Sequence, residues 1–256
     1  MAKKITKLTR LTNPAKPAVS VVLATYNEKE NIIPLIAAVI KNLENGGKRG
    51  KYGFEILVVD DSSPDGTYDA VMARYGKDKR IKAVRRFERG LATALRRGIE
   101  ESSGVVVVLM DTDFSHDPSQ LPELVGLAFK YGVGNGSRFT SGGRFVGKRY
   151  RSFVTRLLQL FARVVLGVPA TDFTNGFVAI RRDALQGTDF DRIFFGYGDY
   201  CFRLFYYVCK VHKGRFRIAE MPSYYKPRVR GQSKTKEFKT GLQYVANILW
   251  LRLGLG

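Results

Sequence analysis

The chain has 256 residues, of which 45% are hydrophobic, and this proportion excludes a disordered protein and provides for one sizeable core. Lys and Arg number 43 against 23 Asp and Glu, which gives a formal charge of +20 at pH 7. A protein this basic is expected to bind anions such as nucleic acid, phosphorylated small molecules or an anionic membrane. Two cysteines in the whole chain argue against a disulfide framework and favour a reducing, cytoplasmic compartment.

The first part of the chain alternates two kinds of pattern after a polar, basic segment at 1–17 that we interpret as a flexible arm. Short β-branched runs predict strands at 19–24, 54–59, 81–84 and 105–110. Helical spacing of apolar residues predicts helices at 31–43, 67–75, 91–101 and 118–131. Four strand–helix alternations predict an α/β fold with a mainly parallel sheet flanked by helices, whereas strand order beyond residue 140 cannot be read.

Polar clusters follow three of the predicted strands, at 25–28, 60–66 and 111–116. In parallel sheets, ligands bind beyond the carboxyl ends of the strands, so we expect functional residues in these clusters. Asp111 and Asp113 would project two carboxylates from one strand end, and such hard oxygen ligands suit Mg²⁺ or Mn²⁺ with substrate phosphates. A solvated loop with acidic caps is the alternative. For the nearby His116 we favour a structural role over metal ligation.

The other two clusters each allow two interpretations. Asp60 and Asp61 could accept hydrogen bonds from a base or ribose, or the cluster could be a turn that caps a helix. Tyr26 offers an aromatic plane and Glu28 a carboxylate, but the same residues would also suit an ordinary helix start at Asn27.

Several segments occur in an order that resembles family 2 glycosyltransferases with a GT-A, Rossmann-like fold. More narrowly, the chain is similar to dolichol-phosphate mannose synthases and related polyprenyl-phosphate glycosyltransferases, over roughly residues 18–240. Each motif is weak alone, whereas the ordered set is specific. The segments are ATYNEKENI (24–32), VVDDSSPDGT (58–67), MDTDFSHDP (110–118), GSRF (136–139), TDFTNGFVAIRR (171–182) and IAEMPSYYKPRVRGQSK (218–234).

The resemblance implies a role for each matching residue. The divalent metal, Mg²⁺ or Mn²⁺, would be held by Asp111, Asp113 and Ser115. The reacting centre and the acceptor phosphate would be contacted by Asp113, Arg138 and Arg151. The nucleotide sugar would be bound by Ala24, Tyr26, Glu28, Asp60, Asp61, Asp111, Thr112, Arg228 and Lys234.

The chain departs from the family pattern at four positions. Ser115 stands where many members have Gln, so a hydroxyl or a water would replace that metal contact. Ala24 replaces a common Pro, and Asn175 replaces a common Ser. In the segment 196–205 the usual acid is displaced, and we assign no role to Asp199, the acidic residue nearest to that position.

The residues themselves, apart from the resemblance, also support a reaction between two phosphate-bearing substrates. A sugar nucleotide and a lipid phosphate are both anions, and a metal with arginines would offset their repulsion. Seven Lys or Arg and no acid lie between residues 138 and 163. A phosphate acceptor, with a second pKa of about 6, is already nucleophilic at neutral pH and needs no strong general base. The family implies a single displacement with inversion.

Two amphipathic helices are expected in the C-terminal half, and they could contact an anionic membrane or pack on the sheet. The first covers 152–166 with an apolar stripe of Phe153, Leu157, Leu160, Phe161 and Val164. The second, at 237–256, follows Lys234 and Lys236 and carries Phe238, Leu242, Val245, Leu249 and Leu253. No apolar run reaches the roughly 18–20 residues that span a bilayer. We therefore divide the chain into an arm (1–17), a catalytic domain (18–236) and an interfacial helix (237–256).

The leading hypothesis is an enzyme that moves mannose from GDP-mannose to a polyprenyl or dolichyl phosphate, peripheral at the cytoplasmic face of a membrane. The first alternative is a UDP-glucose-dependent transferase or one with a saccharide acceptor. A remote alternative is a non-catalytic nucleic-acid-binding protein, disfavoured because no recognition helix or RNA-binding aromatic motif is present. No Gly-x-Gly-x-x-Gly follows the first strand, which argues against a dinucleotide oxidoreductase.

Overall fold

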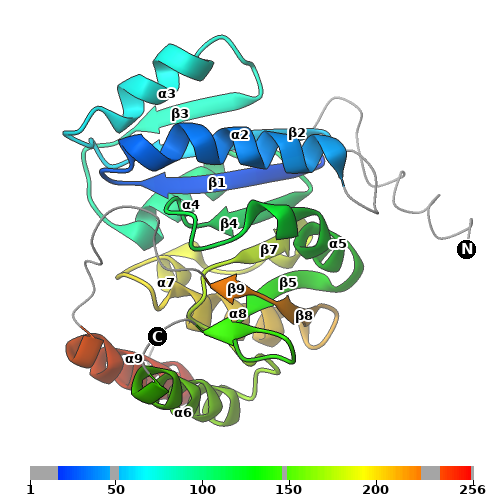
Figure 1. Cartoon of the computed structure of the whole chain (residues 1–256). Coiled ribbons are helices and arrows are strands. Elements are labelled where there is room, and N and C mark those ends of the chain that lie inside the picture. The colour runs from blue at the N-terminus through cyan, green and yellow to red at the C-terminus, as the bar shows by residue number, and fades with distance from the viewer. Residues whose placement is uncertain (1–16, 47–51, 146–148, 226–236, 255–256) are drawn as a thin grey trace, which may run out of the picture.

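A seven-stranded sheet runs through the centre of the molecule (Figure 1), in the order β3-β2-β1-β4-β7-β5-β8. The structure is a computed structural model that describes residues 17–46, 52–145, 149–225 and 237–254. The strand β7 is antiparallel to both of its neighbours, and the other pairs in this sheet are parallel. The strands are β1 (Val19–Thr25), β2 (Phe54–Asp60), β3 (Ile81–Arg85), β4 (Val106–Met110), β5 (Gly132–Ser137), β7 (Val178–Arg181) and β8 (Arg217–Pro222).

Helices cover both faces of this sheet. One core lies against α2, α3 and α5, and the other lies against α4, α6, α7, α8 and α9. A separate two-stranded ribbon pairs β6 (Arg144–Phe145) with β9 (Tyr224–Tyr225). The helices are α2 (Lys29–Asn45), α3 (Thr67–Tyr75), α4 (Leu91–Glu101), α5 (Leu121–Tyr131), α6 (Arg149–Leu166), α7 (Phe190–Ile193), α8 (Tyr200–His212) and α9 (Glu237–Leu253).

Burial on both faces explains why the central strands are continuous apolar runs. In β1, Val19, Val21 and Leu23 enter the core beneath α2, whereas Val22 enters the core beneath α4. Successive side chains of a strand point to opposite faces, so both sets must be apolar when both faces are covered. Burial of such a side chain contributes about 1.5–3 kcal/mol.

The predicted α/β fold is confirmed, and the eight predicted elements of the first half lie where β1 to α5 are found. The predicted helix at 118–131 begins with a short 3₁₀ turn, Pro118–Gln120, and continues as α5. The strand order that the sequence left unread depends on β7, which inserts between β4 and β5. Because β7 is antiparallel, the loop 171–177 that enters it lies at the carboxyl edge of β4 and β5.

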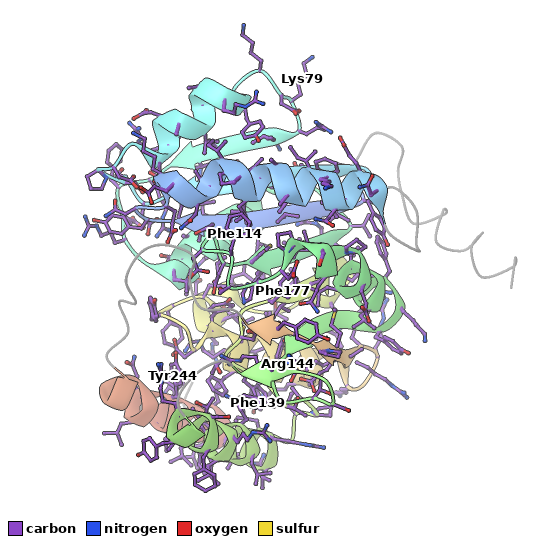
Figure 2. The ribbon with its side chains drawn as sticks, in the orientation of Figure 1. Lys79, Phe114, Phe139, Arg144, Phe177 and Tyr244 are labelled. Atoms are coloured by element: carbon purple, nitrogen blue, oxygen red, sulfur yellow. The ribbon has the colours of Figure 1, made fainter. Side chains whose placement is uncertain are left out.

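The helices α6 and α9 lie side by side at the bottom of Figure 1. They pack on the core through Ala162 and Leu166 of α6 and through Ile248 and Leu251 of α9. Their outer faces are apolar and exposed, with α6 side chains projecting away from the sheet (Figure 2). The exposed apolar residues are Tyr150, Phe153, Val154, Leu157, Leu160 and Val164 of α6 and Leu242, Leu249 and Leu253 of α9.

Most of the stripe predicted for α6 is therefore on the surface rather than against the sheet. Phe161 is an exception, because it lies on the inner flank of the helix and packs partly against the core. On α9, Val245 is half-buried, and the side chain of Phe238 lies outside the described residues. Within the described part of the chain, every helix is too short or too polar to cross a bilayer.

Gly134 of β5 permits the close approach of α5 to the sheet. A Cβ at this position would lie 2.5 Å from the backbone oxygen of Leu124. We predict that Gly134→Ala lowers the free energy of unfolding by about 1–3 kcal/mol, because backbone cannot yield as a side chain can. Urea denaturation measures this change.

Gly241→Ala is the matched control for that measurement. Gly241 lies in α9, and apart from the backbone of its own helix and its chain neighbours, no atom of the described residues lies within 4 Å of an added Cβ. Alanine should stabilise this helix by up to about 1 kcal/mol. Equal effects of the two substitutions would contradict the packing argument.

Candidate active site

The carboxyl edge of the sheet gathers the three predicted polar clusters. Thr25, at the end of β1, pairs in register with Asp60, at the end of β2. The side chain of Asp60 is fully buried, and it accepts hydrogen bonds from the Thr25 hydroxyl (3.0 Å) and from the Ser63 hydroxyl and backbone N–H (2.6 and 2.9 Å). These bonds point inward, which favours the turn-capping role for Asp60 over contact with a base or ribose.

Asp61 instead faces the loop that follows β3. Its carboxylate forms an ion pair with Arg86 and accepts a hydrogen bond from the backbone N–H of Gly90 at 2.9 Å. Arg86 also donates to the carbonyl of Gly90 and to the hydroxyl of Thr93, both at 2.9 Å. The turn at Asp61 and the loop 86–90 are thereby held as one unit.

The first cluster lies next to this unit. The guanidinium carbon of Arg89 lies 4.3 Å from the centre of the Tyr26 ring. Glu28 accepts a hydrogen bond from Asn31 at 2.8 Å at the start of α2, and Ala24 is half-buried against the core. A hollow of about 280 Å³ opens beside the same turn, lined by Ser62, Ser63, Pro64, Gly66, Asp69, Arg85 and Phe87.

The acidic loop after β4 is built around a buried carboxylate. Asp113 is 2% exposed, and its Oδ1 accepts a hydrogen bond from the Ser115 N–H at 3.0 Å. Phe114 between them has a positive φ of 61°, which closes the turn. The Asp111 side chain is 37% exposed, and Thr112 is buried. The loop is thus a formed turn with one inner and one outer carboxylate, rather than a solvated loop.

This loop has the composition of a divalent metal site. The Ser115 hydroxyl is fully buried, and among the described residues it has no hydrogen-bond partner. It lies two residues from the Asp113 carboxylate, at the position where the sequence predicts a weak third ligand. In the described ranges, no three side chains of His, Cys, Asp or Glu form a metal cluster. Two carboxylates and a hydroxyl fit Mg²⁺ or Mn²⁺, which take their other ligands from phosphates and water.

His116 joins the acidic loop to the loop that enters β7. Its Nδ1 accepts a hydrogen bond from the Asp111 N–H (3.1 Å), so Nε2 carries the proton and donates to the Asn175 carbonyl (2.8 Å). Its ring stacks on Phe177 at 4.9 Å. Both ring nitrogens are engaged, which agrees with the structural role favoured from sequence.

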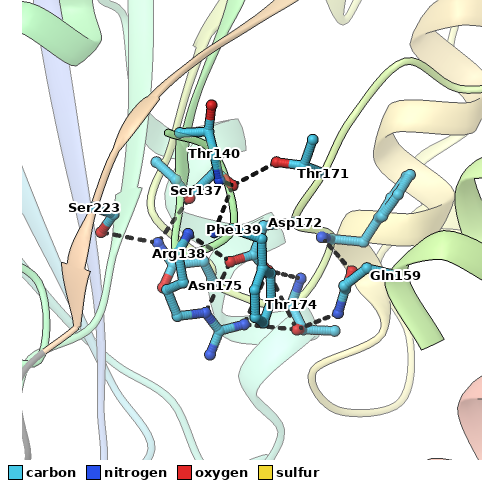
Figure 3. Close-up of polar contacts among 12 residues, drawn as sticks. Ser137, Arg138, Phe139, Thr140, Gln159, Thr171, Asp172, Thr174, Asn175 and Ser223 are labelled. Carbon is cyan, nitrogen blue, oxygen red and sulfur yellow. Dashed lines mark hydrogen bonds and ion pairs between the residues drawn. The ribbon is translucent and has the colours of Figure 1, made fainter. Parts of the chain in front are cut away.

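Arg138 contacts the same loop that enters β7, through Asp172 and Thr174 (Figure 3). It is 7% exposed, and its Nε and Nη2 donate to the two carboxylate oxygens of Asp172 at 2.8 and 2.9 Å. The loop 171–177 thus contacts both the acidic loop, through His116, and Arg138. Of the other predicted basic residues, Arg151 is exposed in the first turn of α6, and Arg228 and Lys234 lie outside the described residues.

Two residues at this edge escaped the sequence analysis. A Cβ on Gly176, which has a φ of +80°, would lie 3.3 Å from the Tyr200 hydroxyl and 3.8 Å from Asp111 Oδ1. Burial raises the pKa of Tyr200 well above its usual value, and Cys201 and the Asp111 charge add to this rise. Tyr200 therefore remains a protonated hydrogen-bond donor close to the acidic loop. The sequence signal that could have pointed to these two residues was Gly176 itself, because it lies inside the motif TDFTNGFVAIRR (171–182).

Asp199 has a structural explanation. It is buried, forms an ion pair with Arg203 one helical turn later, and accepts a hydrogen bond from Asn247 of α9. The guanidinium of Arg203 also donates to the carbonyls of Ile193 and Phe195. The Arg203 guanidinium balances the charge of this carboxylate within the fold, which is consistent with no role for Asp199 in the reaction.

The mainly parallel sheet, with an acidic loop at the carboxyl end of β4, defines the class as a GT-A, Rossmann-like α/β fold. Residues 20–188 match the model of the family described as "Glycosyl transferase family 2", and the chain belongs to this family. It is 32% identical over 237 residues to a "Dolichol-phosphate mannosyltransferase" of Pyrococcus furiosus. That alignment covers 90% of this chain and 62% of the relative, so the chain spans less than two thirds of that protein's length.

Further comparisons agree with this family. The chain is 34% identical to an "Undecaprenyl-phosphate mannosyltransferase" of Micrococcus luteus, over 83% of this chain and 85% of the relative. Its fold is similar to that of glucosyl-3-phosphoglycerate synthase from Mycobacterium tuberculosis, solved with Mn²⁺ and UDP, with a TM-score of 0.66 and 22% identity over 98% of this chain and 84% of the other. Mannosyl-3-phosphoglycerate synthase from Rubrobacter xylanophilus has the same TM-score at 18% identity, over 100% and 83% of the two chains.

We predict that His116→Phe lowers the free energy of unfolding by about 2–4 kcal/mol. Phenylalanine can keep the stacking on Phe177, but it removes the hydrogen bonds that His116 makes with the Asp111 N–H and the Asn175 carbonyl. The loss of each hydrogen bond costs about 1–3 kcal/mol. Urea denaturation is the measurement. His116→Asn is the matched variant, because its Oδ1 can take the place of Nδ1 and recover part of the loss. Wild-type stability of His116→Phe would show that the two bonds do not matter.

Proposed function

We propose that this chain is a metal-dependent transferase that moves mannose from GDP-mannose to a polyprenyl or dolichyl phosphate. One observation carries the proposal. The loop 171–177 contacts both the acidic loop of Asp111 and Asp113, through His116, and the guanidinium of Arg138. Such an arrangement suits a reaction between two phosphate-bearing substrates, because each needs positive charge close to it. The two mannosyltransferase relatives support the choice of sugar and acceptor.

The acidic loop would hold the divalent metal through Asp111, Asp113 and Ser115. A bound Mg²⁺ or Mn²⁺ supplies positive charge that stabilises the nucleoside diphosphate as it leaves. The buried Ser115 hydroxyl and the inward Asp113 carboxylate support this assignment. A fold neighbour solved with Mn²⁺ and UDP gives further support for a metal.

The nucleotide would bind at the edge formed by Tyr26, Asp61 and the loop 86–90. Tyr26 offers an aromatic face for the base, and Arg86 and Arg89 offer positive charge around it. Ala24, Glu28 and Thr112 belong to the same edge of the sheet, and Asp60 supports it from within. Arg228 and Lys234 would close over the diphosphate from the segment between β9 and α9.

The acceptor phosphate would bind at Arg138, and the resemblance adds Arg151, which is exposed in the first turn of α6. Its phosphate is mostly dianionic at neutral pH and attacks the sugar without a strong general base. Asp199 forms an ion pair with Arg203, and we assign it no role as a base. Asp172 fixes the guanidinium plane of Arg138 through Nε and Nη2, so contact with a phosphate oxygen would be made through Nη1.

We predict that Asp113→Ala lowers mannosyl transfer by roughly 100-fold or more, because it removes a ligand of the group that stabilises the leaving diphosphate. Formation of labelled polyprenyl-phosphate mannose with Mg²⁺ or Mn²⁺ measures the rate. Asp191→Ala is the control, since that carboxylate is 81% exposed on α7. Undiminished transfer by Asp113→Ala would exclude the metal assignment.

A separate thermal-shift series distinguishes between the candidate sugar-nucleotide donors. A bound ligand raises stability by mass action, so GDP-mannose with Mn²⁺ should raise the Tm more than UDP-glucose does. A larger shift with UDP-glucose would favour a glucosyltransferase, the alternative that the UDP-bound fold neighbour suggests. Strong, salt-sensitive binding to duplex DNA without any nucleotide-sugar shift would favour the nucleic-acid-binding alternative.

We further propose that the outer faces of α6 and α9 rest on an anionic membrane leaflet, which would be the cytoplasmic one. The exposed apolar stripe of α6 is accompanied by exposed Arg151, Arg156 and Arg163. Apolar side chains beside basic ones are typical of helices that lie in the membrane interface. An acceptor lipid lying along this surface would bring its phosphate towards Arg138, because α6 contacts the loop that holds that residue.

We predict that Leu157→Glu with Leu160→Glu weakens binding to phosphatidylglycerol-containing vesicles at least about tenfold. The change removes apolar side chains from the bilayer and adds two negative charges near an anionic surface, at about 1 kcal/mol each. Vesicle sedimentation measures the binding. Met72→Glu is the control, because Met72 is an exposed apolar residue on α3, at the opposite end of the molecule (Figure 1). Equal loss in both proteins would contradict the assigned surface.

A further inference from the structure

The inner face of α6 carries a buried glutamine. Gln159 is 3% exposed, whereas the other described side chains of α6 are either apolar or at least partly exposed to solvent. Its Oε1 accepts a hydrogen bond from the Phe173 N–H at 2.8 Å, and its Nε2 donates to the Thr174 hydroxyl at 3.0 Å (Figure 3). A buried amide costs stability unless it is hydrogen-bonded, so this side chain is fixed to the loop 171–177.

The Thr174 hydroxyl is the junction of this contact with Arg138. It also accepts a hydrogen bond from Arg138 Nη2 at 2.8 Å and donates its proton towards Asp172 Oδ1 at 3.4 Å. A hydroxyl has one proton and two lone pairs, and all three are used here. A displacement of Gln159 would therefore change the position of the hydroxyl that Arg138 contacts.

The orientation of the Arg138 guanidinium depends on this junction. Asp172 fixes one edge of the guanidinium at two points, and Thr174 shares the Nη2 group with it. Asp172 itself accepts a hydrogen bond from the Thr174 N–H at 3.1 Å, so both partners of the arginine move together. These contacts use Nε and Nη2, so the acceptor phosphate would be contacted through Nη1, whose direction changes when the guanidinium plane tilts.

We propose that Gln159 and Thr174 are positioning residues that set the guanidinium of Arg138 for the acceptor phosphate. This inference rests on the function proposed above for Arg138. The helix that faces the membrane with its outer side thereby fixes the acceptor-binding arginine with its inner side. Gln159 thereby links the contact of α6 with the bilayer to the location of the acceptor phosphate.

The test compares acceptor and donor kinetics in variants of both residues. Thr174→Val should raise the KM for undecaprenyl phosphate in phosphatidylglycerol–phosphatidylcholine vesicles about tenfold, the loss expected for one hydrogen bond to a charged group. Gln159→Met, which removes the bond that holds the Thr174 hydroxyl, should raise the same KM several-fold. The KM for the nucleotide sugar and kcat should stay within about twofold. Thr174→Ser keeps the hydroxyl and should restore the acceptor KM. Gln243→Met, an exposed position on α9, is the matched control.

Three outcomes would overturn the proposal. The first is an unchanged acceptor KM in both variants. The second is a parallel change of the donor KM, acceptor KM and Tm, which a merely structural role would produce. The third is a failure of Thr174→Ser to restore the acceptor KM.

Arg138→Lys separates this proposal from the function on which it rests. If Arg138→Lys leaves the acceptor KM unchanged, the assignment of Arg138 to the acceptor phosphate fails. If Arg138→Lys raises the acceptor KM while Gln159→Met and Thr174→Val do not, the function stands and the positioning role fails.

Discussion

The buried ion pair between Arg138 and Asp172 is the constraint on which the proposed reaction centre depends. Removal of one partner from such a pair costs about 3–5 kcal/mol, because the other charge is left buried without compensation. The fold surrounds Asp172 with further bonds, since Glu220 of β8 accepts hydrogen bonds from the backbone N–H groups of Thr171 and Asp172 at 2.9 and 3.3 Å. The arginine is thus held by a loop that the sheet itself anchors.

Charge is distributed unevenly around this centre. The acidic loop after β4 carries carboxylates, whereas Arg138, Arg86 and Arg89 lie in other loops, and the first two are paired with Asp172 and Asp61. In the proposed reaction a diphosphate and a lipid phosphate would repel each other, and a bound metal together with arginines would offset the repulsion. The proposed phosphate-bearing substrates and anionic leaflet would account for the high positive charge of the chain.

Local patterns predicted a large part of the fold and some of the site. The strands β1, β2 and β4 could be read because burial on both faces demands continuous apolar runs. The pair Asp111 and Asp113 could be singled out because it follows such a run directly. The inward orientation of Asp60 could not be read, since a strand-end carboxylate can cap a turn or face a ligand with the same sequence. The hydrogen bond that Asp199 accepts from Asn247 could not be read either, because the two residues lie 48 positions apart along the chain.

The sequence by itself determined the α/β class, the positions of the first strands and helices, and the family, because these depend on periodicity and ordered local motifs. Only the tertiary structure decided that β7 inserts antiparallel between β4 and β5, that the loop 171–177 therefore lies at the carboxyl edge, and that Gln159 reaches it from α6. These relations join residues that are distant along the chain, and the packing of several elements at once selects them. Local propensity acts over only a few residues and cannot specify such contacts.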